Sequence, residues 1–144
     1  MDITIEQATP EDADEVCRLI EVNRLPLDRL REYLATALVA RRGGEIVGVA
    51  ALEVYPDGAL MRSVAVAPDL QRRGLGRRLT DAILQLASDL HVPHAYLLTT
   101  SAERYFPKFG FETIARAEVP GSVRASVEFT SACPSSAIVM RKSL

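Results

Sequence analysis

The sequence predicts one α/β (α+β) domain in which helices cover both faces of a mixed β-sheet. Its 144 residues, 48% of them hydrophobic and 25% charged, are typical of a single globular domain with an ordinary core. Short apolar stretches bounded by glycine and proline alternate with longer stretches whose apolar residues recur at helical spacing. The resulting order, β-α-α-β-β-β-α-β-α-β-(α)-β, indicates a mixed sheet. No repeat or linker divides residues 1–144, so we expect one domain.

The first half of the chain is expected to form two helices and four strands. Thr9 and Pro10 mark the start of a helix that ends near Asn23, because a capping hydroxyl and a following proline favour a first helical turn. A second, shorter helix is expected to begin at Pro26 and end at Leu34. Glycine and Pro-Asp-Gly turns separate the strands. These strands are expected at residues 3–7, 37–41, 45–55 and 59–67.

The second half contains the clearest helical pattern of the chain. From Gly74 to Leu90 the apolar residues recur at the spacing of one helix face. Ser101 can cap a short helix that runs through Phe109, and Gly110 can end it in the left-handed conformation. A further short helix is expected over residues 120–129, and strands are expected at residues 94–100, 111–115 and 137–141.

Composition argues against several classes of partner. The net charge of −2 and the isoelectric point of about 5.7 favour neither nucleic acid nor an anionic membrane. No apolar run approaches the roughly 20 residues that span a bilayer, and the first residues lack the pattern of a signal peptide. Cys17 and Cys133 lie far apart and the chain has two histidines, so we expect free thiols in a reducing cytoplasm and no metal site.

The stretch QRRGLGR, residues 71–77, has the features of an anion-binding loop. It follows a strand that Pro68 ends, and it opens the strongest helix. A helix N-terminus offers unpaired backbone N–H groups and a partial positive charge. Gly74 and Gly76 let a phosphate group approach the backbone, and the neighbouring arginines can add charge-assisted hydrogen bonds. The spacing is neither that of a P-loop nor G-x-G-x-x-G, and a solvated turn is the alternative.

The stretch SVAVAPDLQRRGLGRRL resembles the coenzyme A motif of the Gcn5-related N-acetyltransferase (GNAT) superfamily, [QR]-x-x-G-x-[GA]. The motif positions are Gln71, Gly74 and Gly76, and YFPKFGFE at residues 105–112 resembles the superfamily's helix followed by Gly-Phe. The resemblance implies the GNAT fold, a mostly antiparallel sheet of six or seven strands with a V-shaped splay. It also implies acetyl-CoA as co-substrate and an N-acetyltransferase that transfers the acetyl group directly in a ternary complex.

Two narrower groups share further features with this chain. YLLTTSAERYFPKFGF and the ending ACPSSAIVMRKSL are similar to small acetyltransferases associated with arsenic resistance and to the acetyltransferase domain of N-acetylglutamate synthases. Both groups imply a small-molecule amine as acceptor, an amino acid or an analogue of one. The alternatives are a protein N-terminal or lysine acetyltransferase, and a non-catalytic acyl-CoA-binding regulatory module. The resemblance to the family also implies a homodimer.

The resemblance assigns the donor site to one strand and to the loop after it. Pantetheine would pair with the strand backbone as an extra strand does, and an amide of Val64 or Val66 would donate to the thioester oxygen. The pyrophosphate would lie on the amides between Arg72 and Arg77, and Phe106 could pack against the pantetheine arm. The expected cofactor-binding residues are Val64, Ala65, Val66, Gln71, Arg72, Arg73, Gly74, Leu75, Gly76, Arg77 and Phe106.

Two residues are candidates for proton transfer. Glu53 shares one strand face with apolar residues near the end that feeds the cleft, so it is the expected general base; an exposed strand carboxylate is the alternative. The superfamily's acid is a tyrosine five residues before the phenylalanine of Gly-Phe, and this chain has Phe106 there. Tyr105 is the adjacent candidate for the acid, although solvent could protonate the departing thiolate instead.

Three residues are candidates for binding the acceptor. Arg62 alternates with Val64 along the expected strand and could hold a substrate carboxylate in a bidentate pair, or could form an ordinary surface salt bridge. Thr99 and Thr100 end a strand at the mouth of the expected cleft and could bind polar groups. Strand propensity and capping explain the two threonines equally well.

Overall fold

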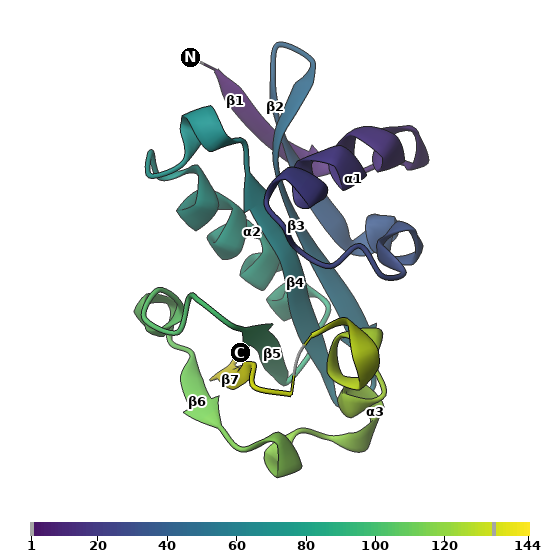
Figure 1. Ribbon diagram of the computed structural model, residues 1–144, viewed down its shortest axis with the longest axis vertical. Helices are drawn as coiled ribbons and strands as arrows, with labels where there is room; N and C mark the ends of the chain where they lie inside the picture. Colours follow the sequence, from purple (N-terminus) through teal and green to yellow (C-terminus); the bar gives the residue numbers. More distant parts are fainter. Residues whose placement is uncertain (1, 134) are drawn as a thin grey trace.

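Seven strands form one mixed sheet in the computed structural model, which describes residues 2–133 and 135–144. Their order across the sheet is β1-β2-β3-β4-β5-β7-β6 (Figure 1). Within the described residues, the pairing of β4 with β5 is parallel and the other pairings are antiparallel. The strands are β1 (Ile3–Gln7), β2 (Ala37–Arg42), β3 (Glu45–Tyr55), β4 (Gly58–Val66), β5 (His94–Thr99), β6 (Glu112–Ile114) and β7 (Ile138–Ser143).

Two amphipathic helices cover the opposite faces of the central strands. Helix α1 (Ala13–Val22) buries Val16 and Ile20 in a cluster with Val49, whereas α2 (Leu75–Asp89) buries its apolar side against the other face (Figure 1). A fully buried side chain of this size stabilises the fold by about 1.5–3 kcal/mol. The mixed sheet with helices on both faces, predicted from the alternating pattern, is confirmed.

A third, short helix packs at the other end of the sheet. Helix α3 (Gly121–Arg124) contributes Val123 to a cluster with Leu60 and Tyr96.

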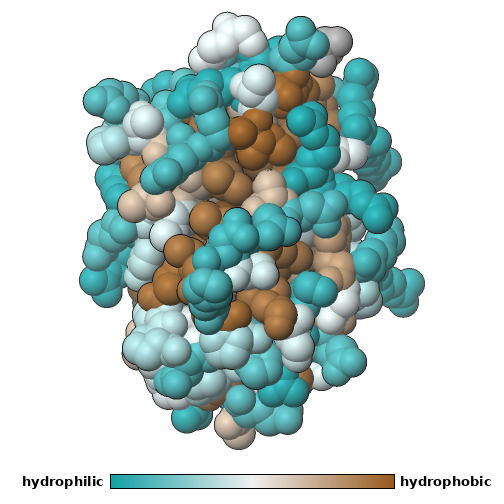
Figure 2. All heavy atoms as spheres, turned by 180° about the vertical axis from the view of Figure 1, so that it is seen from behind, coloured by the Kyte–Doolittle hydropathy of each residue, from teal (hydrophilic) through white to brown (hydrophobic). Residues whose placement is uncertain are grey.

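On the rear face of the molecule, hydrophobic groups lie between hydrophilic side chains (Figure 2). Among the described residues, none of the helices is both long and apolar enough to cross a bilayer.

The prediction of a helix from Pro26 to Leu34 is wrong in the position and the type of the helix. A 3₁₀ helix, Leu30–Thr36, replaces it. Arg29 lies inside the expected helix and adopts the left-handed backbone conformation, with φ of 58°, which interrupts a continuous α-helix there. Arg24, with φ of 59°, lies in the turn that follows α1. The segment before Leu30 is therefore an irregular loop.

The two short helices expected in the C-terminal part are also corrected. The Thr99 hydroxyl, not Ser101, accepts hydrogen bonds from the backbone after β5, at 2.9 Å from the Ala102 amide, and only a 3₁₀ turn, Phe106–Phe109, follows. The expected helix over residues 120–129 is divided into α3 and a π-helical turn, Glu128–Ala132. This division places Glu128 at the start of a turn of its own.

Candidate active site

Strands β4 and β5 separate soon after they meet, and a cavity fills the gap. Their parallel pairing is confined to Ala59 with Ala95 and Leu60 with Tyr96. Beyond these pairs the strands diverge around a cavity of about 570 Å³, here called the splay cavity. It is lined by residues 23–26, 28, 61–64, 97–102, 106, 128, 133 and 137. The V-shaped splay implied by the resemblance is thus present.

A β-bulge on β4 faces this gap. The register with β3 runs from Val49–Ala65 directly to Ala51–Arg62, which leaves Ser63 and Val64 without partners on β3. Ser63 adopts φ of 57°, a left-handed conformation that a regular strand does not contain. Because the pairing with β5 ends at Leu60, the backbone of residues 63 and 64 lies outside both ladders among the described strands. Both residues border the splay cavity, so this part of the β4 backbone lies where a ligand would bind.

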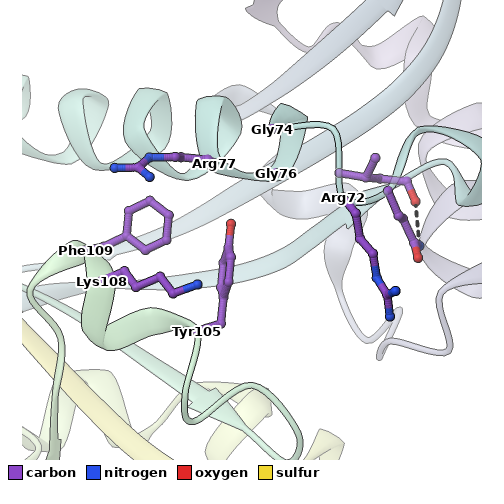
Figure 3. Close-up of a pocket in the computed structure, with 9 residues that line it drawn as sticks. Arg72, Gly74, Gly76, Arg77, Tyr105, Lys108 and Phe109 are labelled. Carbon is purple, nitrogen blue, oxygen red and sulfur yellow. Dashed lines mark hydrogen bonds between the residues drawn. The ribbon is translucent and has the colours of Figure 1, made fainter.

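A second cavity lies where α2 begins. It has a volume of about 400 Å³, and we call it the loop cavity. Arg72, Gly74, Gly76 and Arg77 border it on one side, while Tyr105, Lys108 and Phe109 approach from the segment after β5 (Figure 3). It is lined by Val66, Gln71, Arg72, Gly74, Gly76, Arg77, Tyr105, Lys108 and Phe109.

The start of α2 fits a diphosphate group. Gly74 has φ of +86°, and a side chain there would be strained although space is open around it. The Arg78 amide is the first to bond back to Gly74 within the helix, at 3.1 Å. The three preceding amides, residues 75–77, have no partner within the helix and carry its positive end. Exposed Arg72 and Arg77 add charge, so the cavity suits an anion.

Gln71 connects the loop cavity to α1 as well as bordering it. Its Nε2 donates to the Val66 carbonyl oxygen at 3.2 Å and to Asn23 Oδ1 at 3.1 Å. Asn23 Nδ2 donates to the same Val66 oxygen at 3.2 Å. The side chain therefore fixes the end of β4 relative to the loop, a positioning role in addition to the expected contact with the cofactor.

The cofactor residues expected from the sequence fall into three groups. Ala65 and Leu75 are buried in the core, and Arg73 is exposed but borders neither cavity. Val64 and Phe106 border the splay cavity. Those that border the loop cavity are Val66, Gln71, Arg72, Gly74, Gly76 and Arg77.

Tyr105 and Phe106 face different cavities although they are adjacent. Their rings meet edge to face with centroids 5.2 Å apart, and Tyr105 belongs to the loop cavity. The Tyr105 hydroxyl points toward Gly76 (Figure 3), where it would be 3.6 Å from an added Cβ. Burial raises the pKa of this hydroxyl above its ordinary value, so it remains protonated at neutral pH.

Glu53, the expected base, is fully buried and makes three hydrogen bonds. Arg62 Nη1 donates to Oε2 at 2.9 Å, Ser126 Oγ donates to Oε1 at 2.6 Å, and the Tyr55 hydroxyl also donates to Oε1. Burial, with the adjacent Glu53 carboxylate, raises the pKa of Tyr55 far above its usual range and keeps it a donor. Because Glu53 has no exposed surface, the alternative of an exposed strand carboxylate is wrong. Glu53 also borders neither cavity.

Arg62 joins this carboxylate to the wall of the splay cavity. Its side chain has no exposed area, so the expected alternative of a surface salt bridge is wrong. Nη1 also donates to the Asp28 carbonyl oxygen at 2.8 Å, and Nη2 donates to that of Pro26 at 3.3 Å. Arg62 therefore holds the loop after α1 against the sheet.

Glu128 is a residue that the sequence analysis missed. It borders the splay cavity with 6% of its surface exposed, and its Oε2 lies 3.7 Å from Arg62 Nη2. Burial raises the pKa of Glu128 against the opposing effect of Arg62. Burial also raises the pKa of the neighbouring Cys133 thiol to about 12, helped by Glu128.

The two threonines at the end of β5 differ in their contacts. Thr99 is 8% exposed, and its hydroxyl accepts hydrogen bonds from the amides of Ser101 and Ala102. Thr100 is exposed. Both border the splay cavity, but the Thr99 hydroxyl is engaged in shaping the turn.

Residues 34–113, more than half of the chain, match the family described as acetyltransferase (GNAT) domain. The chain belongs to this family. Its mixed sheet and its splay are those that the resemblance implied.

Relatives of this GNAT domain include an amino-acid acetyltransferase from Neisseria meningitidis, 29% identical over 131 residues that make up 85% of this chain. The matched part is 30% of that relative, so the chain spans less than a third of its length.

Two solved structures share the fold. N-acetylglutamate synthase from Neisseria gonorrhoeae, complexed with coenzyme A and N-acetyl-glutamate, has a TM-score of 0.86 and 24% identity; the match covers 100% of this chain and 35% of that one. A Mycobacterium tuberculosis protein in complex with CoA has a TM-score of 0.83 and 24% identity, and 98% of this chain and 99% of that chain are covered. The resemblance to N-acetylglutamate synthases is confirmed at the level of fold, whereas that to arsenic-associated enzymes stays a prediction.

Proposed function

We propose that this GNAT domain transfers an acetyl group from acetyl-CoA to the amine of an amino acid or a close analogue, directly and in a ternary complex. The observation that carries the proposal is the placement of two cavities along one strand. Val66 of β4 borders the loop cavity and Val64 borders the splay cavity, two residues away. Donor and acceptor held at adjacent sites need no covalent enzyme intermediate, because proximity supplies much of the acceleration.

The loop cavity is the donor end. Acetyl-CoA supplies an activated acetyl thioester and carries a diphosphate. The amides of residues 75–77 and the exposed side chains of Arg72 and Arg77 match that diphosphate. The amide of Val64, in the bulge, is the proposed donor to the thioester oxygen, since Val64 borders the splay cavity whereas Val66 is in register with Gly48 on β3.

The splay cavity is the acceptor end. Its walls combine apolar side chains, such as Met61, Leu97 and Phe106, with charges of both signs. Arg24 and Asp28 are exposed at its border, and Glu128 is buried there. A small molecule with an ammonium group, a carboxylate and a short apolar part fits this set, in agreement with the name of the N. meningitidis relative.

Two expected catalytic residues receive different roles. Glu53 is fully buried, accepts three hydrogen bonds and holds Arg62, so we propose a positioning role for it. Tyr105 lies at the loop cavity, where its protonated hydroxyl could donate to the departing thiolate or to the cofactor. A cytoplasmic location and a homodimer remain predictions.

An acceptor screen tests the proposal. Release of free coenzyme A is followed with a thiol reagent while the protein and acetyl-CoA meet the twenty L-amino acids, polyamines, aminoglycosides and peptides. The proposal expects turnover with one or a few amino acids. Preference for peptides would instead support a protein acetyltransferase, and background release with every amine would support a non-catalytic module.

Binding of the donor is tested separately with Gly74→Glu. At φ of +86° the new side chain is strained, and its carboxylate repels the diphosphate. Acetyl-CoA should raise the melting temperature of the wild type and leave that of the variant unchanged. Gly121→Ala, at an open site without positive φ, is the matched control and should retain the shift. No shift with the wild type would contradict acetyl-CoA as the donor.

A further inference from the structure

Three charged side chains meet behind the splay cavity, and their charges do not balance. Arg62 lies 2.9 Å from a carboxylate oxygen of Glu53 and 3.7 Å from one of Glu128. The exposed fractions of these side chains are 0% for Arg62, 0% for Glu53 and 7% for Glu128. Two carboxylates against one guanidinium leave one negative charge in excess, in surroundings where burial makes an unbalanced charge costly.

The excess charge belongs to Glu128. Glu53 takes the shorter contact with Arg62 and two further donors. Glu128 has the longer contact with Arg62 and a hydrogen bond from the Cys133 thiol, and its Oε2 accepts no hydrogen bond from the described residues. A buried carboxylate oxygen without a donor is rare in folded proteins. Of the two acids, only Glu128 borders the splay cavity. Glu128 is thus the acid of this cluster that lines the cavity and has a carboxylate oxygen without a donor.

We propose that Glu128 binds the ammonium group of the acceptor and removes its proton. This inference rests on the proposed function and names the residue that selects and activates the amine. A protonated amine would supply the donor that Oε2 lacks and would balance the charge of the cluster. Arg62 then acts as a positioning residue rather than as a clamp for a carboxylate, because two acids already surround it.

The chemical step is balanced by two proton movements. One proton passes from the ammonium nitrogen to Glu128, which leaves a neutral amine and a neutral carboxyl group. The amine lone pair forms the new carbon–nitrogen bond with the acetyl carbon, the carbon–sulfur bond breaks, and the second amine proton leaves with the thiolate as free coenzyme A. Glu128 returns its proton to solvent.

The groups around Glu128 favour this use. Burial raises the pKa of Glu128 most, and Glu53 and Asp28 raise it further, whereas Arg62 and the hydrogen bond from Cys133 lower it. The Cys133 thiol, whose own pKa is raised to about 12, stays protonated. A carboxylate with a raised pKa accepts a proton more readily than an ordinary one near neutral pH.

The test compares Glu128→Gln with the wild type. The glutamine side chain keeps the shape of glutamate, but it carries no negative charge to attract an ammonium group and cannot take up its proton. We expect kcat/KM for the best amino acid to fall about 100-fold or more at pH 7.5, in the range typical of a lost general base. The residual activity should rise with pH as the free amine loses its own proton. The Kd for acetyl-CoA, measured by calorimetry, should stay within about twofold of the wild type. Glu112→Gln, an exposed acid on β6, is the control and should change neither quantity.

Two outcomes would overturn the inference. Glu128→Gln with activity within about threefold of the wild type and an unchanged pH profile would show that Glu128 takes no proton. Loss of acetyl-CoA binding or a large fall in the melting temperature would show that its role is structural. In both cases the wild type still transfers acetyl groups, so these results differ from a failure of the proposed function, in which the wild type is inactive with every amino acid.

A binding measurement decides the question independently of turnover. Protein saturated with coenzyme A is titrated with the best-binding L-amino acid and with the 2-hydroxy acid of the same side chain. The wild type should bind the ammonium compound at least tenfold more tightly than the hydroxy compound, and Glu128→Gln should lose this preference. An equal preference in both proteins, or none in the wild type, would refute Glu128 as the ammonium site.

Discussion

Replacement of Arg62 by methionine is the most informative perturbation of this fold. Among the residues that the structure describes, Arg62 is the single cation paired with Glu53 and Glu128, and its side chain is completely buried. Methionine fills a similar volume without charge or donors. Both carboxylates would then remain in the interior, and the carbonyl oxygens of Pro26 and Asp28 would lose their hydrogen bonds from the guanidinium.

The expected cost follows from the burial. Removing one partner of a buried ion pair typically destabilises a protein by about 3–5 kcal/mol, because the other charge is left without compensation. For a domain of this length, 1 kcal/mol corresponds to roughly 3 °C in melting temperature. We therefore expect a fall of about 10–15 °C for Arg62→Met. Neutralising an acid as well, in Glu53→Gln with Arg62→Met, should cost less than the sum of the single changes.

Urea denaturation at pH 7.5, followed by circular dichroism, measures this cost. The control is Arg31→Met, which removes an ion pair with Asp14 whose side chains are 60% and 77% exposed, and its midpoint should hardly move. A loss below about 1 kcal/mol for Arg62→Met, with an unchanged denaturant slope, would refute the reasoning that the cluster depends on this cation.

Two further predictions concern stability. The hydrogen bond from Arg41 lowers the pKa of Asp12 in the folded state, so its contribution is present above the unfolded value of about 3.9 and is lost as the pH falls through the folded value. Urea midpoints between pH 7 and pH 2.5 should therefore fall more steeply for the wild type than for Asp12→Asn, and parallel curves would contradict this. Gly58→Ala would place a Cβ 2.8 Å from the Tyr96 ring and should cost about 1–3 kcal/mol. Gly121→Ala, with no atom within 4 Å, should cost far less, and equal costs would oppose the steric explanation.

The features that local sequence determines were predicted well. Helix α2 followed from the periodicity of its apolar residues, and the loop before it followed from Gly74 and Gly76, whose backbone requirements leave a mark in the sequence. The strands β2, β3 and β4 followed from apolar stretches between turns. The short helix after β5 failed because two residues compete for the same local role: the Thr99 hydroxyl, and not that of Ser101, accepts from the amides of residues 101 and 102.

The acceptor site depends on contacts between distant residues. Glu53 and Ser126 are 73 positions apart in the sequence, and no pattern along the chain indicates that the serine hydroxyl will donate a hydrogen bond to the carboxylate. Glu128 lay inside an expected short helix, where an acidic residue is ordinary. Its one trace in the sequence is its place between Val127 and Phe129, an acid among apolar neighbours. The bulge at Ser63 and Val64 also depends on the pairing of β3 with β4.

Initial-rate kinetics test direct transfer between the two cavities most directly. Acetyl-CoA and the best amino acid are varied together, and the product is identified by mass spectrometry. Sequential binding at the loop cavity and the splay cavity predicts intersecting double-reciprocal lines and an N-acetylated amino acid. Parallel lines with an acetylated protein intermediate, or no acetylated product from any amino acid, would contradict it.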